Sequence, residues 1–290
     1  MRWQGGRQSE NVEDRRGARP KVAVAGGLGT LVLILLALVL GIDPRPFLNP
    51  RGAGGPAPIG ANGGDNAVVA ADPAEEERVA FVKVILADTE DVWSDLFADQ
   101  GRRYEDPVLV LFRDQVASAC GVAGSATGPF YCPGDRKVYL DLAFFDDLAR
   151  DYGAPGEFAQ AYVIANEVGH HVQNLMGTLS RVEAVRRRAS EAESNQSQLR
   201  LELQADDYAG VWAHHAQKAR NLLQRGDVEA SIRAAQAVGD DTLQNNAQGY
   251  AVPDSFTHGT SVQRARWFRK GFETGDLEAG DTFSIPYDRL

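Results

Sequence analysis

The chain has 290 residues and a formal net charge of −10, with 43% hydrophobic and 24% charged residues. This length is sufficient for one large domain or two small ones, each with a hydrophobic core. The acidic balance and the lack of a stripe rich in Lys and Arg argue against nucleic acid as a main partner.

The N-terminal region combines a basic flank with an apolar stretch. Residues 1–21 carry six Lys or Arg against three acids, and residues 22–42 carry no charge. A helix over 22–42 would be roughly 31 Å long, about the thickness of a bilayer's hydrocarbon core. A cleaved signal peptide is the alternative, but its apolar core usually has about 7–15 residues and ends in a small-residue cleavage site. We therefore expect one transmembrane helix over 22–42, with residues 1–21 in the cytoplasm because the basic flank precedes it.

The rest of the chain divides into a spacer and a folded domain. Residues 43–76 are rich in Gly, Pro, Ala and Asn and are expected to form a flexible linker. Helical periodicity begins at Pro73, and we place one domain over 77–290. Within that domain, residues 107–112 and 137–142 are predicted to be strands.

The only two cysteines, Cys120 and Cys132, lie between these predicted strands. Because the domain is expected outside the cytoplasm, a spacing of twelve residues favours a disulfide. Two buried free thiols, or half of a metal site, are the alternatives.

One amphipathic helix is predicted over 157–177. Its apolar face is formed at three- and four-residue steps by Phe158, Ala161, Tyr162, Ala165, Gly169, Val172 and Met176. Asn166, Glu167 and His170 in this helix form Asn-Glu-Val-Gly-His, which differs at one position from the zinc signature His-Glu-x-x-His. Residues four apart share a helix face, so positions 166 and 170 can hold one metal ion while Glu167 approaches a bound water.

A second long helix is predicted over 196–220, after a charged run at 181–195 that we interpret as a solvated helix face. It carries Glu202 and Asp206 four residues apart, beside apolar positions. Carboxylates in such a place are costly unless they are paired, hydrogen-bonded or metal-bound. A catalytic zinc needs three protein ligands and one open position for water, so the two helices together come close to a complete peptidase site.

Several stretches along nearly the whole chain resemble the bacterial membrane-anchored neutral zinc metallopeptidases. They are MRWQGGRQSENVEDRRG, ACGVAGSATGPFYCPGDRKVYLDLAFFDDL, GAPGEFAQAYVIANEVGHHVQNLMG, LELQADDYAGVWA, VPDSFTHGTSVQRARWFRKGFETGD and DTF. The resemblance implies an α+β, zincin-like domain, mainly helical, with a small sheet packed on the active-site helix.

The resemblance also assigns roles to particular residues. His170 matches the second zinc ligand, Glu202 the third ligand and Glu167 the general base. Asp206 matches a carboxylate that orients a ligand histidine. His258 is a candidate for stabilising the oxyanion of the tetrahedral intermediate.

The sequence departs from the family pattern at three positions. Asn166 occupies the seat of the first zinc-ligand histidine and offers only a neutral amide oxygen, which suits hard cations better than zinc. Asp207 and Gly280 stand where the family usually has cysteines, so a second disulfide is absent. His171 lies about 100° around the helix from His170, so we do not expect it to substitute.

The function predicted from these residues is a membrane-anchored zinc metallopeptidase of the endopeptidase type, with one zinc ion and a peptide or protein substrate. The alternative is a non-catalytic relative that binds peptides or a membrane protein. The expected location is the bacterial inner membrane, single-pass, with the C-terminal domain periplasmic or extracellular. Other residues receive structural interpretations: His171, His214 and His215 as surface or supporting residues, Trp212, Trp267 and Phe268 as core, and Arg264, Arg266, Arg269 and Lys270 as a solvated face.

Overall fold

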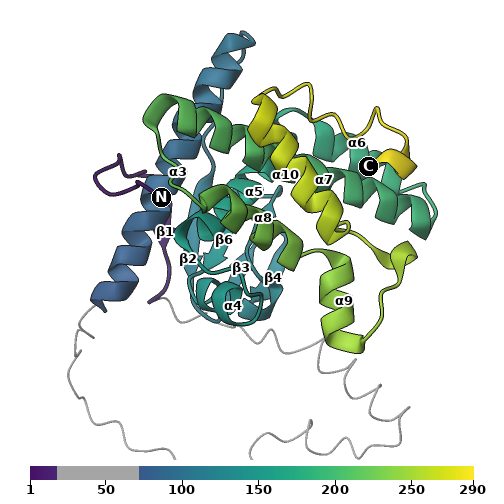
Figure 1. The fold of residues 1–290 in the computed structure, drawn as a ribbon, viewed down its shortest axis with the longest axis horizontal. Coiled ribbons are helices and arrows are strands. Elements are labelled where there is room, and N and C mark those ends of the chain that lie inside the picture. The colour runs from purple at the N-terminus through teal and green to yellow at the C-terminus, as the bar shows by residue number, and fades with distance from the viewer. Residues whose placement is uncertain (18–71) are drawn as a thin grey trace, which may run out of the picture. The chain divides into compact units, whose positions relative to one another are not determined.

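The computed structural model describes residues 1–17 and 72–290, which form one compact unit (Figure 1). The predicted transmembrane helix at 22–42 and most of the predicted linker lie outside the described residues. In the described part of the chain, no helix is both long and apolar enough to cross a membrane.

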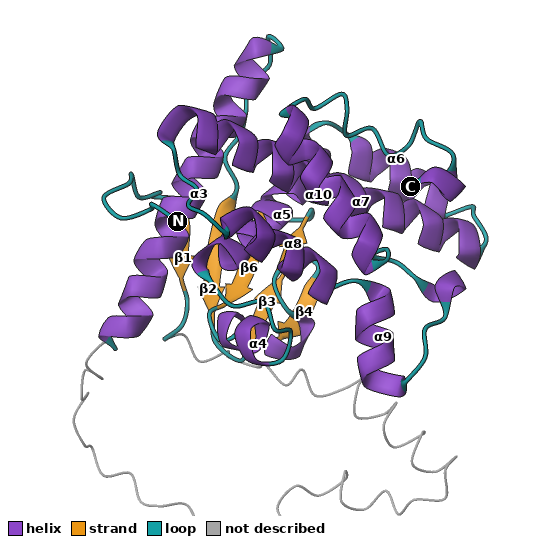
Figure 2. Ribbon diagram, viewed as in Figure 1, coloured by secondary structure: helices purple, strands orange, loops and turns teal. Residues whose placement is uncertain are grey.

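A small sheet and eight helices account for the fold of the described residues, in agreement with the predicted α+β class (Figure 2). The four-stranded sheet has the order β1-β2-β6-β5, with bounds Val12–Asp14, Val108–Phe112, Lys137–Asp141 and Phe130–Cys132. Its first three strands are parallel, and β5 runs antiparallel to β6 at the edge. A separate hairpin pairs β3, Gln115–Ser118, with β4, Gly121–Gly124. Strands β2 and β6 confirm the two predicted strands.

The helices pack around α5, which is the predicted amphipathic helix. Their bounds are Pro73–Asp99 for α3, Phe144–Arg150 for α4, Glu157–Leu175 for α5, Thr178–Arg186 for α6, Glu191–Arg220 for α7, Asp227–Ala237 for α8, Asp240–Gln248 for α9 and Ser261–Thr274 for α10. Helix α5 contacts α3, α7 and α8, so its apolar face lies at the centre of the molecule. Trp212, Trp267 and Phe268 are buried, as predicted.

Two predicted boundaries were wrong. Helix α3 begins at Pro73, where the Asp72 carboxylate accepts a hydrogen bond from the Ala74 amide, so residues 73–76 are helical and not linker. The second long helix was predicted to begin at residue 196, but α7 begins at Glu191 after the Ser190 capping box. Most of the charged run at 181–195 is exposed, as predicted, although α6 ends within it at Arg186.

Helices α7 and α10 approach each other closely because both carry glycine at the contact. A Cβ atom at Gly210 would lie 2.1 Å from the Phe268 carbonyl oxygen, and one at Gly271 would lie 2.0 Å from the Asp207 carbonyl oxygen. Any larger residue would push the helices apart. This contact places the N-terminal half of α10 beside the carboxylates of α7.

The predicted disulfide is present between Cys120 and Cys132, with 5.8 Å between their Cα atoms. It joins the residues between β3 and β4 to the end of β5. The β3–β4 hairpin is thereby tied to the edge of the main sheet.

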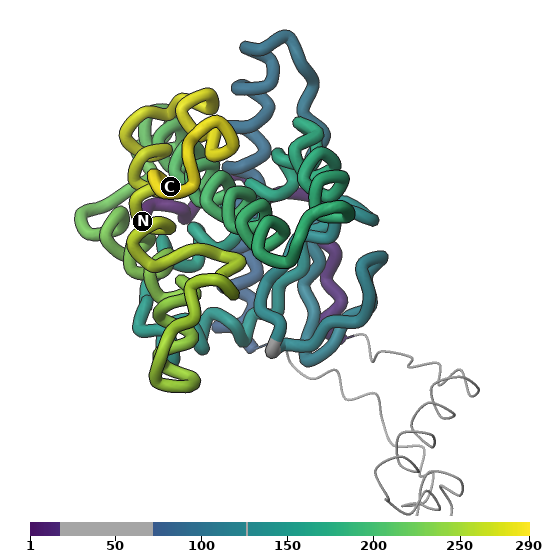
Figure 3. Tube along the Cα trace, turned by 90° about the vertical axis from the view of Figure 1, so that its right-hand side faces the viewer, coloured from purple at the N-terminus to yellow at the C-terminus, as the bar shows by residue number. Residues whose placement is uncertain are grey.

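Residues 1–17 belong to the same compact unit as the C-terminal domain, which disagrees with the predicted topology. In Figure 1 the purple N-terminal trace runs beside α3 at one edge of the folded unit, and Figure 3 shows it from another side. Strand β1 pairs with β2, the Trp3 side chain is 7% exposed, and Arg16 bonds to Glu75 and Glu76 at 2.9 and 2.8 Å. A single crossing by 22–42 would put these partners on opposite sides of a membrane, so a cytoplasmic 1–21 segment does not fit this fold.

Candidate metallopeptidase site

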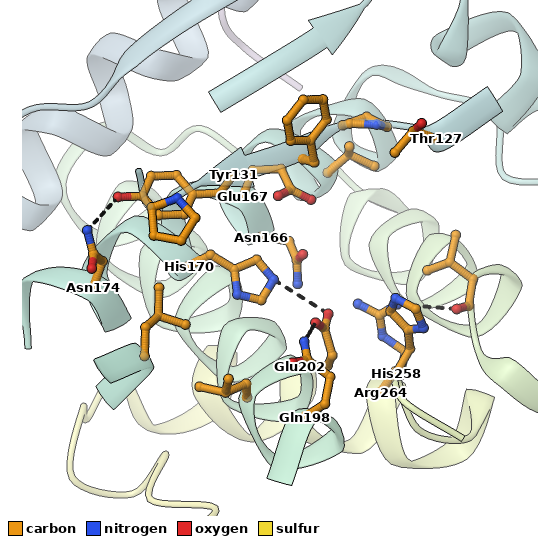
Figure 4. A pocket seen from close by; sticks show the side chains of 18 of the residues that line it. Thr127, Tyr131, Asn166, Glu167, His170, Asn174, Gln198, Glu202, His258 and Arg264 are labelled. Carbon is orange, nitrogen blue, oxygen red and sulfur yellow. Dashed lines mark hydrogen bonds and ion pairs between the residues drawn. The ribbon is translucent and has the colours of Figure 1, made fainter. Parts of the chain in front are cut away.

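A cavity of about 900 Å³ lies against α5 and is walled by β5, α4, α6, α7 and the start of α10. Asn166, Glu167, His170, Glu202 and His258 all line it (Figure 4). Asp206 lies behind this wall and is fully buried. The structure therefore brings together the residues that were predicted to share a site.

The polar residues of α5 that line the cavity are spaced at three or four residues, so they lie on one face of the helix. Asn166, His170 and Asn174 lie four residues apart, and Glu167 is beside them on the same side. Apolar residues on the opposite side anchor the helix in the core. The polar face is thus fixed by the burial of the other face.

His170 and Glu202 face each other across the cavity, with 3.5 Å between His170 Nε2 and Glu202 Oε2. Gln173 Nε2 donates to the Leu201 carbonyl at 2.8 Å, so its Oε1 must face His170 Nδ1, which lies 2.9 Å away. His170 Nδ1 therefore carries the proton and donates it to Gln173. Gln198 holds the other oxygen of Glu202 through a bond of 2.7 Å.

Each of the two side chains has one polar atom held by a glutamine and one that faces the other residue. When His170 is neutral, its Nε2 lone pair points at the cavity, and the second nitrogen is fixed by a partner outside the site. Glu202 likewise has one oxygen held and one oxygen free toward His170.

Asn166, which the resemblance assigns to the seat of the first ligand histidine, contacts Asp206. Its Nδ2 donates to Asp206 Oδ1 at 3.0 Å. Because an ionised carboxylate only accepts hydrogen bonds, this contact fixes the amide orientation and leaves Asn166 Oδ1 pointing away from Asp206. Figure 4 shows the oxygen of Asn166 on the side of Glu167.

Asp206 is held by a buried ion pair that the sequence did not predict. Arg264 Nε donates to Oδ2 at 2.8 Å and Nη2 donates to Oδ1 at 2.9 Å, while the Tyr162 hydroxyl also donates to Oδ1. Arg264 is 4% exposed, so its interpretation as part of a solvated face was wrong. Its charge belongs to the support of the site.

The carboxylates that face the cavity have different protonation behaviour. Burial raises the pKa of Glu167 to about 7, and Glu202 adds to this while His170 opposes it. Burial acts in the same sense on Glu202, but His170 outweighs it and holds the pKa of Glu202 below its usual range. Burial lowers the pKa of His170, but Glu202 outweighs it and raises that pKa to about 9. One carboxylate is thus suited to exchange protons near neutral pH, and the other stays ionised.

His258 lines the cavity on the side of α10, where Asp240 holds it. The His258 amide donates to Asp240 Oδ2 at 2.6 Å, and its Nδ1 lies 3.2 Å from Asp240 Oδ1. This hydrogen bond raises the pKa of His258, against the effect of burial. Its predicted contact with an oxyanion stays a prediction.

Comparison with known proteins identifies the family of this chain. The model of the family described as "Putative neutral zinc metallopeptidase" matches residues 1–283. The chain belongs to this family. "Uncharacterized protein YpfJ" of Escherichia coli strain K12 is 45% identical over 293 residues, which cover 98% of this chain and 99% of that protein. "Uncharacterized protein Rv2575" of Mycobacterium tuberculosis strain H37Rv is 43% identical over 191 residues, 62% of this chain and 64% of that protein. No solved structure matches.

The name of the zinc metallopeptidase family implies zinc, and the residues present fit a zinc ion in part. His170 and Glu202 could supply two strong metal donors. The amide oxygen of Asn166, in the same cavity, is the candidate for a third and weaker donor. In the described part of the chain, no group of three or more His, Cys, Asp or Glu could hold a metal ion. The site therefore has one donor fewer than a catalytic zinc site of the usual kind.

Four residues that support this metallopeptidase site were missed in the sequence. Tyr162 is four residues before Asn166, Gln198 is four before Glu202, and Gln173 is three after His170, so helical spacing could have found them. Arg264 comes from another helix, and nothing in its local sequence links it to Asp206.

Two of the predictions about other histidines can also be judged. His171 is 1% exposed, so of the two predicted positions, surface or supporting, the surface position was wrong. Its ring bonds to the Glu105 carbonyl and to the hydroxyl of Tyr131, which lines the cavity. His171 does point away from the cavity, as predicted. His214 and His215 bond to the carbonyls of Phe272 and Gly275 at the end of α10.

Proposed function

We propose that this protein is a zinc metallopeptidase that hydrolyses peptide bonds in the cavity against α5. We also propose that it binds zinc weakly, because Asn166 replaces a ligand histidine. The observation that carries the proposal is the His170–Glu202 pair, 3.5 Å apart, with each residue fixed by a glutamine and with Glu167 beside it. An ordinary surface pair of His and Glu would not need a glutamine to hold each of its two side chains.

His170 and Glu202 would hold the zinc ion, with the Asn166 amide oxygen in the third place. Zinc bound there supplies a lowered pKa for its water and polarises the substrate carbonyl. Glu167, which lines the cavity beside His170, would accept the proton of the water and pass it to the leaving amine. His258, held by Asp240, would donate a hydrogen bond to the developing oxyanion.

The edge strand β5 supports a peptide as the substrate. Phe130 and Tyr131 of this strand line the cavity, and β5 pairs only with β6 in the described sheet. An extended peptide can add to such an edge through main-chain hydrogen bonds. A peptide bound in this way would lie along the cavity that contains Glu167 and His170.

Asn166 favours a second candidate function, a non-catalytic relative that binds peptides or a membrane protein without cleaving them. Both candidates use the same cavity and the same edge strand. The two candidate functions differ in one expected result: only the peptidase should gain hydrolysis when Asn166 is replaced by histidine.

The experiment compares the unmodified protein with Asn166→His and with Asn166→His plus Glu167→Gln, using a quenched fluorescent peptide mixture. Asn166→His is expected to create hydrolysis or increase it at least about tenfold, since a complete ligand set activates the water. The double variant keeps the metal but loses hydrolysis, because only the base is removed. Hydrolysis that does not rise in Asn166→His would leave the non-catalytic candidate.

We also propose that residues 22–42 attach the protein to a membrane and that residues 1–17 lie on the same, outer side as the domain. The uncharged sequence of 22–42 supports attachment. The packing of 1–17 in the unit of 72–290 supports a common side, and the disulfide supports an oxidising compartment.

A further inference from the structure

We propose that the end of the cavity beside Val163 is a subsite that selects a large apolar side chain of the bound peptide. The subsite consists of Gly128, Pro129, Phe144, Tyr152 and Val163, all of which line the cavity. The inference rests on the proposed function, since it specifies the substrate of the same site.

The cavity face of α5 changes character along the helix. Val163 lies one turn before Glu167, while His170 and Asn174 lie at the other end of the same face. Residues four apart have Cβ atoms about 5–6 Å apart, so an apolar side chain on Val163 is next to the bond that Glu167 serves. A substrate residue on the Val163 side of the bond to be cleaved would therefore meet an apolar surface, and a residue on the His170 side would meet a polar one.

Two aromatic rings, those of Phe144 and Tyr152, line the same cavity as Val163. The rings of Phe144 and Tyr152 have centroids 6.1 Å apart and are tilted by 42°. A Cβ atom at Gly128 would lie 3.6 Å from the Phe144 ring, so the turn before β5 rests on that ring. Both rings are only partly buried, and burial of their remaining apolar surface by a ligand is favourable.

The charges on the cavity wall exclude an acidic side chain from this end. Three basic residues of the described lining lie elsewhere: His170 on α5 beyond Glu167, Arg186 on α6 and His258 before α10. Arg264 reaches Tyr162, next to Val163, but it is already paired with Asp206. The charged group near Phe144 is Asp147, one turn later on α4, and Arg150 pairs with it at 2.6 Å. An acidic side chain would meet like charge and no partner, whereas a Leu or Phe side chain would meet apolar walls.

The test measures peptide affinity with the unmodified full-length protein in the presence of a chelator, so that hydrolysis plays no part. The probes are fluorescent peptides that are identical except for Gly, Glu, Leu or Phe at one central position. The Phe and Leu peptides are expected to bind about tenfold more tightly than the Gly peptide, the size of the preference that an apolar pocket gives. Equal affinities, or no binding by any of the four peptides, would overturn the proposal.

Variants then locate the preference. Phe144→Ala and the nearly isosteric Val163→Thr are expected to reduce the ratio of Phe to Gly affinity to about two or less. Leu179→Ala, on the α6 side of the same cavity, should leave that ratio unchanged. Val163→Thr keeps the proposal testable if Phe144→Ala does not fold. A ratio that survives in both subsite variants, or that is lost equally in Leu179→Ala, would contradict the assignment.

A photoreactive benzoylphenylalanine in the central position of the peptide shows directly which protein residues the side chain contacts. Cross-links are expected at residues of the subsite and not on α6. A preference for apolar peptides without hydrolysis in Asn166→His would refute the proposed catalysis alone, whereas hydrolysis without the preference would refute the subsite alone.

Discussion

Asn166 imitates a histidine in one respect and fails in another. It donates a hydrogen bond to Asp206, as a ligand histidine would, and its helix position is the same. Under the proposed function, Asp206 would support a metal ligand at this position. What is missing is a nitrogen donor that reaches the metal, because the amide side chain is shorter and its oxygen is neutral.

The buried pair of Asp206 and Arg264 holds this support together. Removing the arginine would leave Asp206 as an uncompensated buried charge. We expect Arg264→Ala to reduce the free energy of unfolding by about 3–5 kcal/mol, and Arg266→Ala, an exposed neighbour on α10, to change it by about 0.5 kcal/mol or less. Urea unfolding of both variants measures this.

A double variant tests the cause. Adding Asp206→Asn to Arg264→Ala removes the unpaired charge and should recover part of the lost stability. If Arg264→Ala costs no more than Arg266→Ala, the ion pair does not support the site.

At the scale of the elements, the junction of α7, α10 and the C-terminal tail contains an unusual carboxylate. Asp207 is fully buried, and both of its oxygens have no hydrogen-bond partner among the described residues. A Cβ atom at Gly280 would lie 2.2 Å from Asp207 Oδ2, so these two positions face each other. They are the two positions at which the sequence departs from the cysteines of the family, and their contact agrees with the joint loss of a second disulfide.

This junction should make stability depend on pH. Burial raises the pKa of Asp207 from 3.8 to about 8, with Asp276 and Asp206 adding to the effect and Lys270 opposing it. The folded state then binds a proton that the unfolded state has lost, so this contribution to stability decreases as pH rises from about 4 toward 8. We expect the free energy of unfolding to fall by about 2 kcal/mol between pH 6 and 8 through this group.

The control is Asp207→Asn, which has nearly the same shape and no charge at any pH. The difference between the unfolding curves of the two proteins at pH 6, 7 and 8 isolates the contribution of Asp207. A constant difference across this range would show that Asp207 does not bind a proton in the folded state.

Local sequence patterns predicted the parts of the fold that depend on local physics. The helical period placed Glu167 and His170 on one face of α5, and the turns and alternation around residues 107–142 placed β2, β6 and the disulfide. Arg264 could not be predicted, because its burial depends on the close contact at Gly210 and Gly271 between two helices. His171 was misjudged for the same reason, since its partner, Glu105, comes from a distant loop.

At the scale of the whole molecule, the N-terminal residues are part of the domain. Trp3 packs edge-on against Phe81 with 5.4 Å between ring centroids, and its indole donates to Glu157 at the start of α5. The N-terminal segment thereby supports the helix that carries the site. Two residues of the basic flank, Arg7 and Arg16, pair with acidic residues of α3, for example Arg7 with Glu90.

This packing predicts that residue 8 and the domain are accessible from the same side of a membrane. The test introduces Gln8→Cys or Gln248→Cys, both exposed, and labels spheroplasts with a maleimide that does not cross membranes. The native cysteines do not react because they form the disulfide. Both variants are expected to label before lysis. Labelling of both only after lysis would keep the common side but refute the outer location, and labelling of one alone would refute the common side.

The most direct measurement of the central claim is the zinc affinity of the unmodified protein and of Asn166→His, determined by competition with a chromogenic chelator. The two residues have similar helix propensity, so the fold is expected to be unchanged. The account predicts that the histidine increases zinc affinity by at least about 100-fold and brings the bound zinc to one ion per chain. Equal affinities in the two proteins would contradict it, as would tight stoichiometric zinc in the unmodified protein.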